Sequence, residues 1–113
     1  MRLDINTSRI DLSTDIRDYV ERRAEFALGR FEHAIVDITV SLEDTNGPRG
    51  GIDQQCKIRV NSTGERSPIL STHTHQEIKA AIDLAFETVS RTVAKSLDRR
   101  IKRKQTPKLA GAI

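Results

Sequence analysis

Two stretches of the chain alternate between apolar and polar residues, and this period of two is the feature that most constrains the fold. The first stretch is IVDITVSLE, residues 35–43, and its apolar parity holds Val36, Ile38, Val40 and Leu42. The second covers residues 52–60, and its apolar parity holds Ile52, Cys56, Ile58 and Val60. Because successive side chains of a strand point to opposite faces, each stretch predicts a strand with one apolar face. A sheet built from such strands is covered on one side.

Weaker strand signals flank these two stretches. Alternation over residues 3–6 predicts a short first strand. The sequence SPILSTH, residues 67–73, predicts a fourth strand, and Pro68 favours a strand end or a sheet edge for its start. A glycine-rich loop over residues 44–51 and a turn around Gly64 separate the last three strands.

Two segments show the apolar spacing of three and four residues that is typical of amphipathic helices. The first begins at the N-cap types Ser13 and Thr14, and its apolar stripe holds Ile16, Val20, Ala24, Ala27 and Phe31. The second begins with a capping box, Thr-x-x-Glu, from Thr74 to Glu77. Its apolar stripe holds Ile78, Ile82, Ala85, Val89 and Val93.

The order of elements is therefore β-α-β-β-β-α, which predicts an α+β fold. We expect a four-stranded mixed sheet with both helices packed on one face, the first helix crossing right-handed between two parallel strands. The second helical pattern ends near residue 104, and Pro107 lies beyond it. We expect a single domain over residues 1–104 and a disordered C-terminal tail over residues 105–113.

Length and composition narrow the class of protein. A chain of 113 residues suits one domain, and its 36% hydrophobic and 31% charged residues are typical of a soluble globular protein. No apolar run approaches the roughly 20 residues that span a bilayer, and the N-terminus lacks the apolar core of a signal peptide. The single cysteine excludes an intrachain disulfide. We expect a cytoplasmic protein with no membrane partner.

The charge of the chain is concentrated at its C-terminal end. Residues 1–90 carry 11 Lys and Arg against 15 Asp and Glu, whereas residues 91–113 carry eight against one. The second helix places its basic residues at spacings of four, four and three along one flank: Arg91, Lys95, Arg99 and Lys102. Charge asymmetry of this kind indicates a surface for a polyanion, and the alternative is a basic end that only maintains solubility.

The first helix shows a related bias. Arg22, Arg23 and Arg30 lie near Tyr19 and Phe26 on one side, and acidic residues occupy the opposite flank. Arginines interleaved with aromatics can pair with phosphates and stack on exposed bases, although each aromatic taken singly is more often a residue that borders the core. If the basic flanks of the two helices face each other, they would border a shared groove for structured RNA.

Signals for other chemistry are weak. His73 and His75 are a potential ligand pair, but no further Cys or acid joins them to complete a tetrahedral metal site. Cys56 shares the parity of its apolar neighbours and is expected in the core. The stretch GPRGG lacks the Gly-Lys-Ser/Thr ending of a phosphate loop, and no catalytic triad or dyad is evident. We expect neither enzymatic activity, nor a cofactor or metal, nor a small-molecule substrate.

Over about residues 1–104 the chain resembles the ribosome hibernation-promoting factor family, also called ribosome-associated inhibitor A or sigma-54 modulation protein. The segment IDLSTDIRDYVERR, residues 10–23, matches the family's Ile-Thr-x-x-Leu-Arg-x-Tyr/Phe-Val pattern. The segment QEIKAAIDLAFETVSRTVAK, residues 76–95, is similar to the family's Asp-x-Tyr-x-Ala-Ile-Asp segment. The chain departs from the family at Thr88 and Phe26, where the family frequently carries Lys.

The resemblance implies a short-form ribosome-associated translation inhibitor. Such a protein would bind the 30S subunit and its 16S rRNA near the decoding region and block tRNA and mRNA in stationary phase or stress. The expected RNA-binding residues are Arg22, Arg23, Arg30, Arg91, Lys95, Arg99 and Lys102. The alternative is a diverged regulatory module that keeps the fold, binds a protein partner and does not bind ribosomes.

Overall fold

The computed structural model describes residues 1–45 and 54–112, with side chains described up to residue 99. These residues follow the predicted order of strands and helices, with a short 3-10 helix added after the first α-helix. The elements are β1 (Arg2–Ser8), α1 (Thr14–Leu28), η1 (Gly29–Ala34), β2 (Ile35–Asp44), β3 (Gln54–Ser62), β4 (Ile69–His75) and α2 (Ile78–Ala112). The predicted strand start at Ile52 and most of the predicted loop 44–51 lie outside the described residues.

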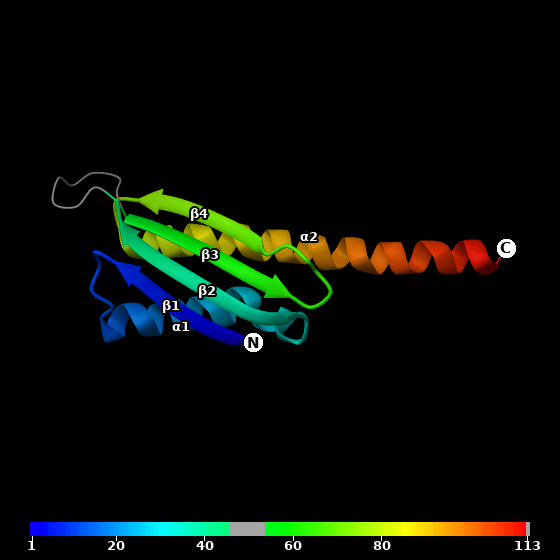
Figure 1. The fold of residues 1–113 in the computed structure, drawn as a ribbon, viewed down its shortest axis with the longest axis horizontal. Helices are drawn as coiled ribbons and strands as arrows, with labels where there is room; N and C mark the ends of the chain where they lie inside the picture. The colour runs from blue at the N-terminus through cyan, green and yellow to red at the C-terminus, as the bar shows by residue number, and fades with distance from the viewer. Residues whose placement is uncertain (46–53, 113) are drawn as a thin grey trace.

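The strands form one four-stranded sheet in the order β1-β2-β3-β4. β1 pairs with β2 in parallel, and the other two pairs are antiparallel, so the sheet is mixed. Both helices lie on the same side of the sheet, and α1 connects the two parallel strands (Figure 1). The predicted α+β fold, with two helices on one face of a four-stranded mixed sheet, is confirmed.

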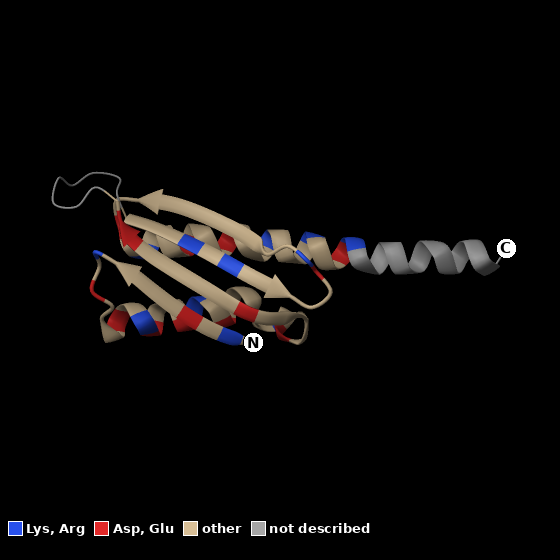
Figure 2. Cartoon of the chain, viewed as in Figure 1, with Lys and Arg blue, Asp and Glu red and all other residues tan. Residues whose placement is uncertain are grey.

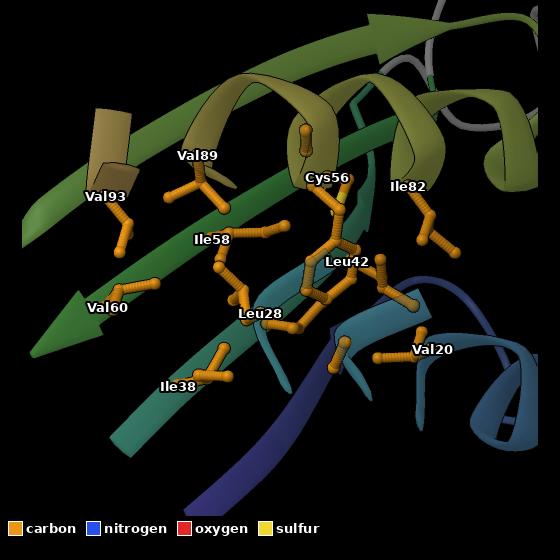
Figure 3. Packing of buried hydrophobic residues seen from close by; sticks show 14 of the residues in the cluster. Val20, Leu28, Ile38, Leu42, Cys56, Ile58, Val60, Ile82, Val89 and Val93 are labelled. Atoms are coloured by element: carbon orange, nitrogen blue, oxygen red, sulfur yellow. The ribbon is translucent and has the colours of Figure 1, made fainter. Parts of the chain in front are cut away.

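The core lies between the sheet and the two helices. Its largest fully buried side chain is Phe86 of α2. Figure 3 shows the side chains of both helices meeting those of the central strands. The fully buried strand positions are Ile38, Val40, Leu42, Cys56, Ile58 and Val60, which is the parity predicted for them. Burial raises the pKa of the Cys56 thiol to about 12, so this cysteine is a core residue, as predicted, and not a thiolate at neutral pH.

Val36 does not take the core position that simple alternation predicts. It is 52% exposed, whereas the preceding Ile35 is only 4% exposed. The pairing of β2 with β3 shifts register between Ile35 and Asp37, which marks a β-bulge. An inserted residue reverses the parity of the side chains before it, so the prediction for Val36 was wrong.

The two helices begin differently from each other. The α1 start is as predicted, because Ser13 Oγ accepts a hydrogen bond of 3.2 Å from a backbone amide of the first turn. The capping box predicted at Thr74 is wrong, because Thr74 pairs with Gln55 inside β4. The carbonyl of Glu77 instead accepts the first helical bond, 3.1 Å from the amide of Ala81.

α2 extends well past the end of the sheet (Figure 1), and the molecule measures 65 × 23 × 20 Å. The helix continues to Ala112, beyond the end near residue 104 that Pro107 suggested. A proline removes one backbone hydrogen bond but does not alone fix where a helix ends. The side chains from residue 100 onward lie outside the described part. The division into a domain over 1–104 and a disordered tail over 105–113 therefore stays a prediction.

The face of the sheet opposite the helices is polar. Lys57 and Arg59 of β3 are exposed on it, and Leu70 of β4, paired with Arg59, is 61% exposed. Because side chains alternate between faces, these residues cannot share a surface with the helices.

Two phenylalanines at opposite extremes of burial test this description of the core. Phe86→Ala should lower the free energy of unfolding by about 3–5 kcal/mol, because it leaves a cavity in a packed interior. Phe26 of α1 is 80% exposed, so Phe26→Ala should change it by no more than about 0.5 kcal/mol. Chemical denaturation of the two variants and the wild type measures both values. Equal losses of stability would contradict the assigned core.

Candidate nucleic-acid interface

A group of polar and aromatic side chains joins α1 to α2; we call it the Asp83 cluster. Asp83 Oδ1 accepts a hydrogen bond of 2.5 Å from the Tyr19 hydroxyl and lies 3.0 Å from Nε of Arg23. Lys79 Nζ lies 2.9 Å from Asp15 Oδ2 and 5.2 Å from the centre of the Tyr19 ring. The pairs advance in the same direction along both helices, so the helices run parallel and their relative height is fixed here.

The cluster shifts two pKa values. The hydrogen bond to Asp83 raises the pKa of Tyr19 above 10.0, and burial adds to this, because both disfavour the phenolate. The hydrogen bond from Lys79, together with its charge, lowers the pKa of Asp15 below 3.8. Both shifts favour the protonation states that these contacts use, a protonated Tyr19 hydroxyl as donor and an ionised Asp15 carboxylate as acceptor.

Arg23 is held between two neighbours. Its Nε is buried and lies close to Asp83, but the geometry is that of an ion pair rather than a directed hydrogen bond. Its guanidinium carbon lies 5.3 Å from the centre of the Phe26 ring, in cation–π range. The side chain keeps 30% of its exposure, so Arg23 contributes both to the contact between the helices and to the surface beside it.

Two contacts fix the rotation of α2 about its own axis. Asp83 faces α1 through the Asp83 cluster, whereas Thr88 faces β4, where its hydroxyl lies 2.8 Å from Nε2 of His73. Arg91, Lys95 and Arg99 follow Thr88 by three, seven and eleven residues, a spacing that keeps them on the same flank of a helix. Arg91, Lys95 and Arg99 therefore lie on the outer flank of α2 toward β4, whereas Lys79 faces α1 in the Asp83 cluster.

We call Arg91, Lys95 and Arg99 the α2 ridge. All three side chains are exposed. Arg91 lies 3.6 Å from Glu87, one turn earlier, and because both side chains are more than half exposed this pair is weak. The predicted fourth member of the ridge, Lys102, has a side chain outside the described part.

The expectation of a groove bordered by two facing basic flanks is wrong. The flank of α2 that faces α1 carries Asp83, whose negative charge neutralises that of Arg23. The α2 ridge lies on the other flank, turned away from α1. The α2 ridge and the arginines of α1 therefore lie apart from each other, and Figure 2 shows the basic positions on both helices.

The other two predicted arginines lie near α1. Arg22 is exposed on the outside of α1, close enough to Tyr19 for its charge to influence that hydroxyl. Arg30 is exposed in η1, where its guanidinium carbon lies 4.6 Å from the centre of the Phe31 ring. Arg22 lines a shallow hollow together with Asp18, Glu21 and Glu25, so it borders the acidic flank of α1 and is not separated from it as the sequence predicted.

The two histidines have local structural contacts. His73 bonds to Thr88, and Nδ1 of His75 accepts a hydrogen bond of 3.0 Å from the amide of Glu77 ahead of α2. Over the described residues, no three His, Cys, Asp or Glu side chains gather as metal ligands would. Within residues 1–45 and 54–112, no helix has the length and apolar character needed to cross a membrane.

The Asp83 cluster is the feature that reading the sequence missed. Its signal was present, since Asp15, Tyr19 and Arg23 recur every four residues on one flank of α1, as do Lys79 and Asp83 on α2. Each set is an ordinary helix flank when taken alone. Only the packing of the helices side by side shows that the two sets are complementary.

Comparison with known proteins adds a family and two structural neighbours. The model of the family described as Sigma 54 modulation protein / S30EA ribosomal protein matches residues 3–102. The crystal structure of the Thermus thermophilus Protein Y N-terminal domain superposes with a TM-score of 0.70 at 20% identity, covering 84% of this chain and 98% of that one. A ribosomal subunit interface protein from Coxiella burnetii gives 0.70 at 16%, covering 87% and 99%. No curated protein sequence matches this chain significantly.

The hydrogen bond at the centre of the Asp83 cluster predicts the behaviour of Tyr19→Phe. At neutral pH the variant should lose about 1 kcal/mol of unfolding free energy, a modest value because both groups are partly solvated. The raised pKa of Tyr19 stabilises the folded wild type fully below pH 10, and this contribution disappears as pH rises through the folded-state pKa. The difference between variant and wild type should therefore shrink in alkaline solution, as denaturation at pH 7 and above pH 10 would show. A difference independent of pH would contradict the assigned bond.

Proposed function

The chain belongs to the Sigma 54 modulation protein / S30EA ribosomal protein family, and from this premise we propose that it is a ribosome-associated inhibitor of translation that binds the small subunit. Its partner in this proposal is the 16S rRNA of the 30S subunit near the decoding region. It acts by occupying space that tRNA and mRNA need, as a binding protein and not as an enzyme, in the cytoplasm of cells in stationary phase or under stress.

The observation that carries this proposal is the α2 ridge. Its three cations lie on one flank of a helix whose opposite side is anchored in the core by Val89 and Val93. The helix therefore cannot rotate about its axis to bring these three side chains to acidic partners on other elements. Like charges at successive turns repel each other, and phosphates placed along the ridge would remove that repulsion.

The arginines of α1 extend the proposed contact. Arg22 and Arg30 are exposed and can reach phosphates, whereas Arg23 shares its charge with Asp83 and would act near the surface of the Asp83 cluster. We assign Lys102 to the same contact from its position in the sequence. The α2 ridge and the arginines near α1 lie on separate elements, so a folded RNA with phosphates on two strands suits them better than one extended strand.

A protein partner is the second candidate, and Phe26 is the observation that favours it. An aromatic side chain that is 80% exposed is common in protein–protein contacts. Binding of this kind would depend little on salt, whereas binding to phosphates weakens steeply as salt rises.

Charge reversal on the ridge tests the proposal. The double variant Arg91→Glu/Lys95→Glu should bind 30S subunits at least about tenfold more weakly, with the slope of log affinity against log salt reduced by about 2. The matched control is Lys57→Glu/Arg59→Glu, which makes the same change of charge on the open face of the sheet. Co-sedimentation across a salt series measures both.

The control keeps the test specific. If both double variants lose affinity equally, net charge alone drives binding and the ridge has no special role. If wild-type binding is independent of salt, the contact is not made through phosphates and the protein-partner candidate is favoured. Circular dichroism of each variant establishes that it is folded.

A further inference from the structure

Phe26 is the most exposed of the large apolar side chains in the described part of the chain. It is 80% exposed although it lies inside α1, where the backbone is regular. The other exposed large apolar residues belong to other elements or to the N-terminus: Met1, Val36, Leu70 and Leu84. Phe26 is therefore an isolated ring on a charged helix surface and not part of an apolar patch.

One face of the Phe26 ring contacts Arg23, and Arg23 is held in place by further contacts. The Arg23 guanidinium lies 5.3 Å from the ring centre, and Arg23 is itself held 3.0 Å from Asp83. Asp83 is fixed in turn by the Tyr19 hydroxyl. One face of the ring thus rests on an anchored cation, and the high exposure of the side chain leaves the other face open.

This arrangement suits a flat π-system that approaches together with negative charge. An apolar protein surface would have to desolvate the guanidinium of Arg23 beneath the ring and the exposed Arg22 one turn earlier. A nucleotide satisfies both features, because its base can stack on the ring while its phosphate neutralises an arginine.

We propose that Phe26 is a stacking platform for an unpaired RNA base, with Arg23 as its positioning residue. This inference rests on the proposed function, since it names how the same surface grips RNA. It adds a contact that depends on ring area and not on charge, at a distance from the α2 ridge.

The first test compares affinity for 30S subunits among variants at position 26. Phe26→Ala should weaken binding by about 5- to 140-fold, the range expected for one stacked base. Phe26→Tyr should restore most of the affinity, because the ring is retained. The salt dependence should be the same in all three proteins, since no charge is changed. Leu70→Ala removes an exposed apolar side chain from the open sheet face and should bind like the wild type.

The second test detects stacking directly. The chain has no tryptophan, so Phe26→Trp introduces a single indole at the proposed platform. Titration with a short single-stranded RNA and with 30S subunits should quench its fluorescence, because a stacked base quenches indole. Leu70→Trp is the matched control and should respond to neither.

The outcomes separate this inference from the function on which it rests. If wild-type protein binds subunits and Phe26→Ala binds equally well, the platform is overturned and the proposed function stands. If wild type does not bind subunits, both are overturned. A photo-crosslinking phenylalanine analogue at position 26 decides the class of partner: a crosslink to an rRNA nucleotide supports the platform, and one to a ribosomal protein overturns it.

Discussion

The packing of α2 across the apolar face of the sheet is the contact on which the other features of this protein depend. Phe86, Val89 and Val93 of α2 are buried in the core that the helices form with the sheet, and their burial fixes both the position of α2 and its rotation. A helix held in this way presents the same flank outward at every turn. The α2 ridge therefore owes its orientation to buried apolar residues of the same helix.

The contact between the helices has a different character from the core beneath it. It is a polar seam in which Asp83 accepts a hydrogen bond from the Tyr19 hydroxyl and forms an ion pair with the Arg23 guanidinium. The flank of α2 that faces α1 is balanced in charge, because Asp83 on it pairs with Arg23 and Lys79 on it pairs with Asp15. The α2 ridge lies on the outer side of α2 toward β4, and the exposed Arg22 and Arg30 lie in α1 and η1. The helix-covered side of the molecule therefore has the α2 ridge on one side of a neutralised seam, and the Phe26 ring lies at the edge of that seam beside Arg23.

Much of the fold could be predicted from alternation and helical spacing, and the errors have identifiable causes. The parity of Ile38, Val40 and Leu42 was predicted correctly because each side of a strand meets one environment along its length. The prediction that Val36 is buried was wrong, because a bulge depends on how β2 pairs with β3 and cannot be recognised in the sequence of one strand. The prediction of a capping box at Thr74 was wrong, because the Thr74 residue pairs with β3 and the helix begins only after β4 ends.

The sequence by itself determined the period of each element, the face that each would bury and the concentration of positive charge on the last helix. These properties are local, since they follow from residues a few positions apart. Only the tertiary structure decided which flanks meet. The rotation of a helix is set by its contacts in the core, which come from strands far away in the chain. The rotation of α2 placed Asp83 against α1 and turned the ridge toward β4. The rotation of α1 left Phe26 in solvent, with Arg23 behind its ring.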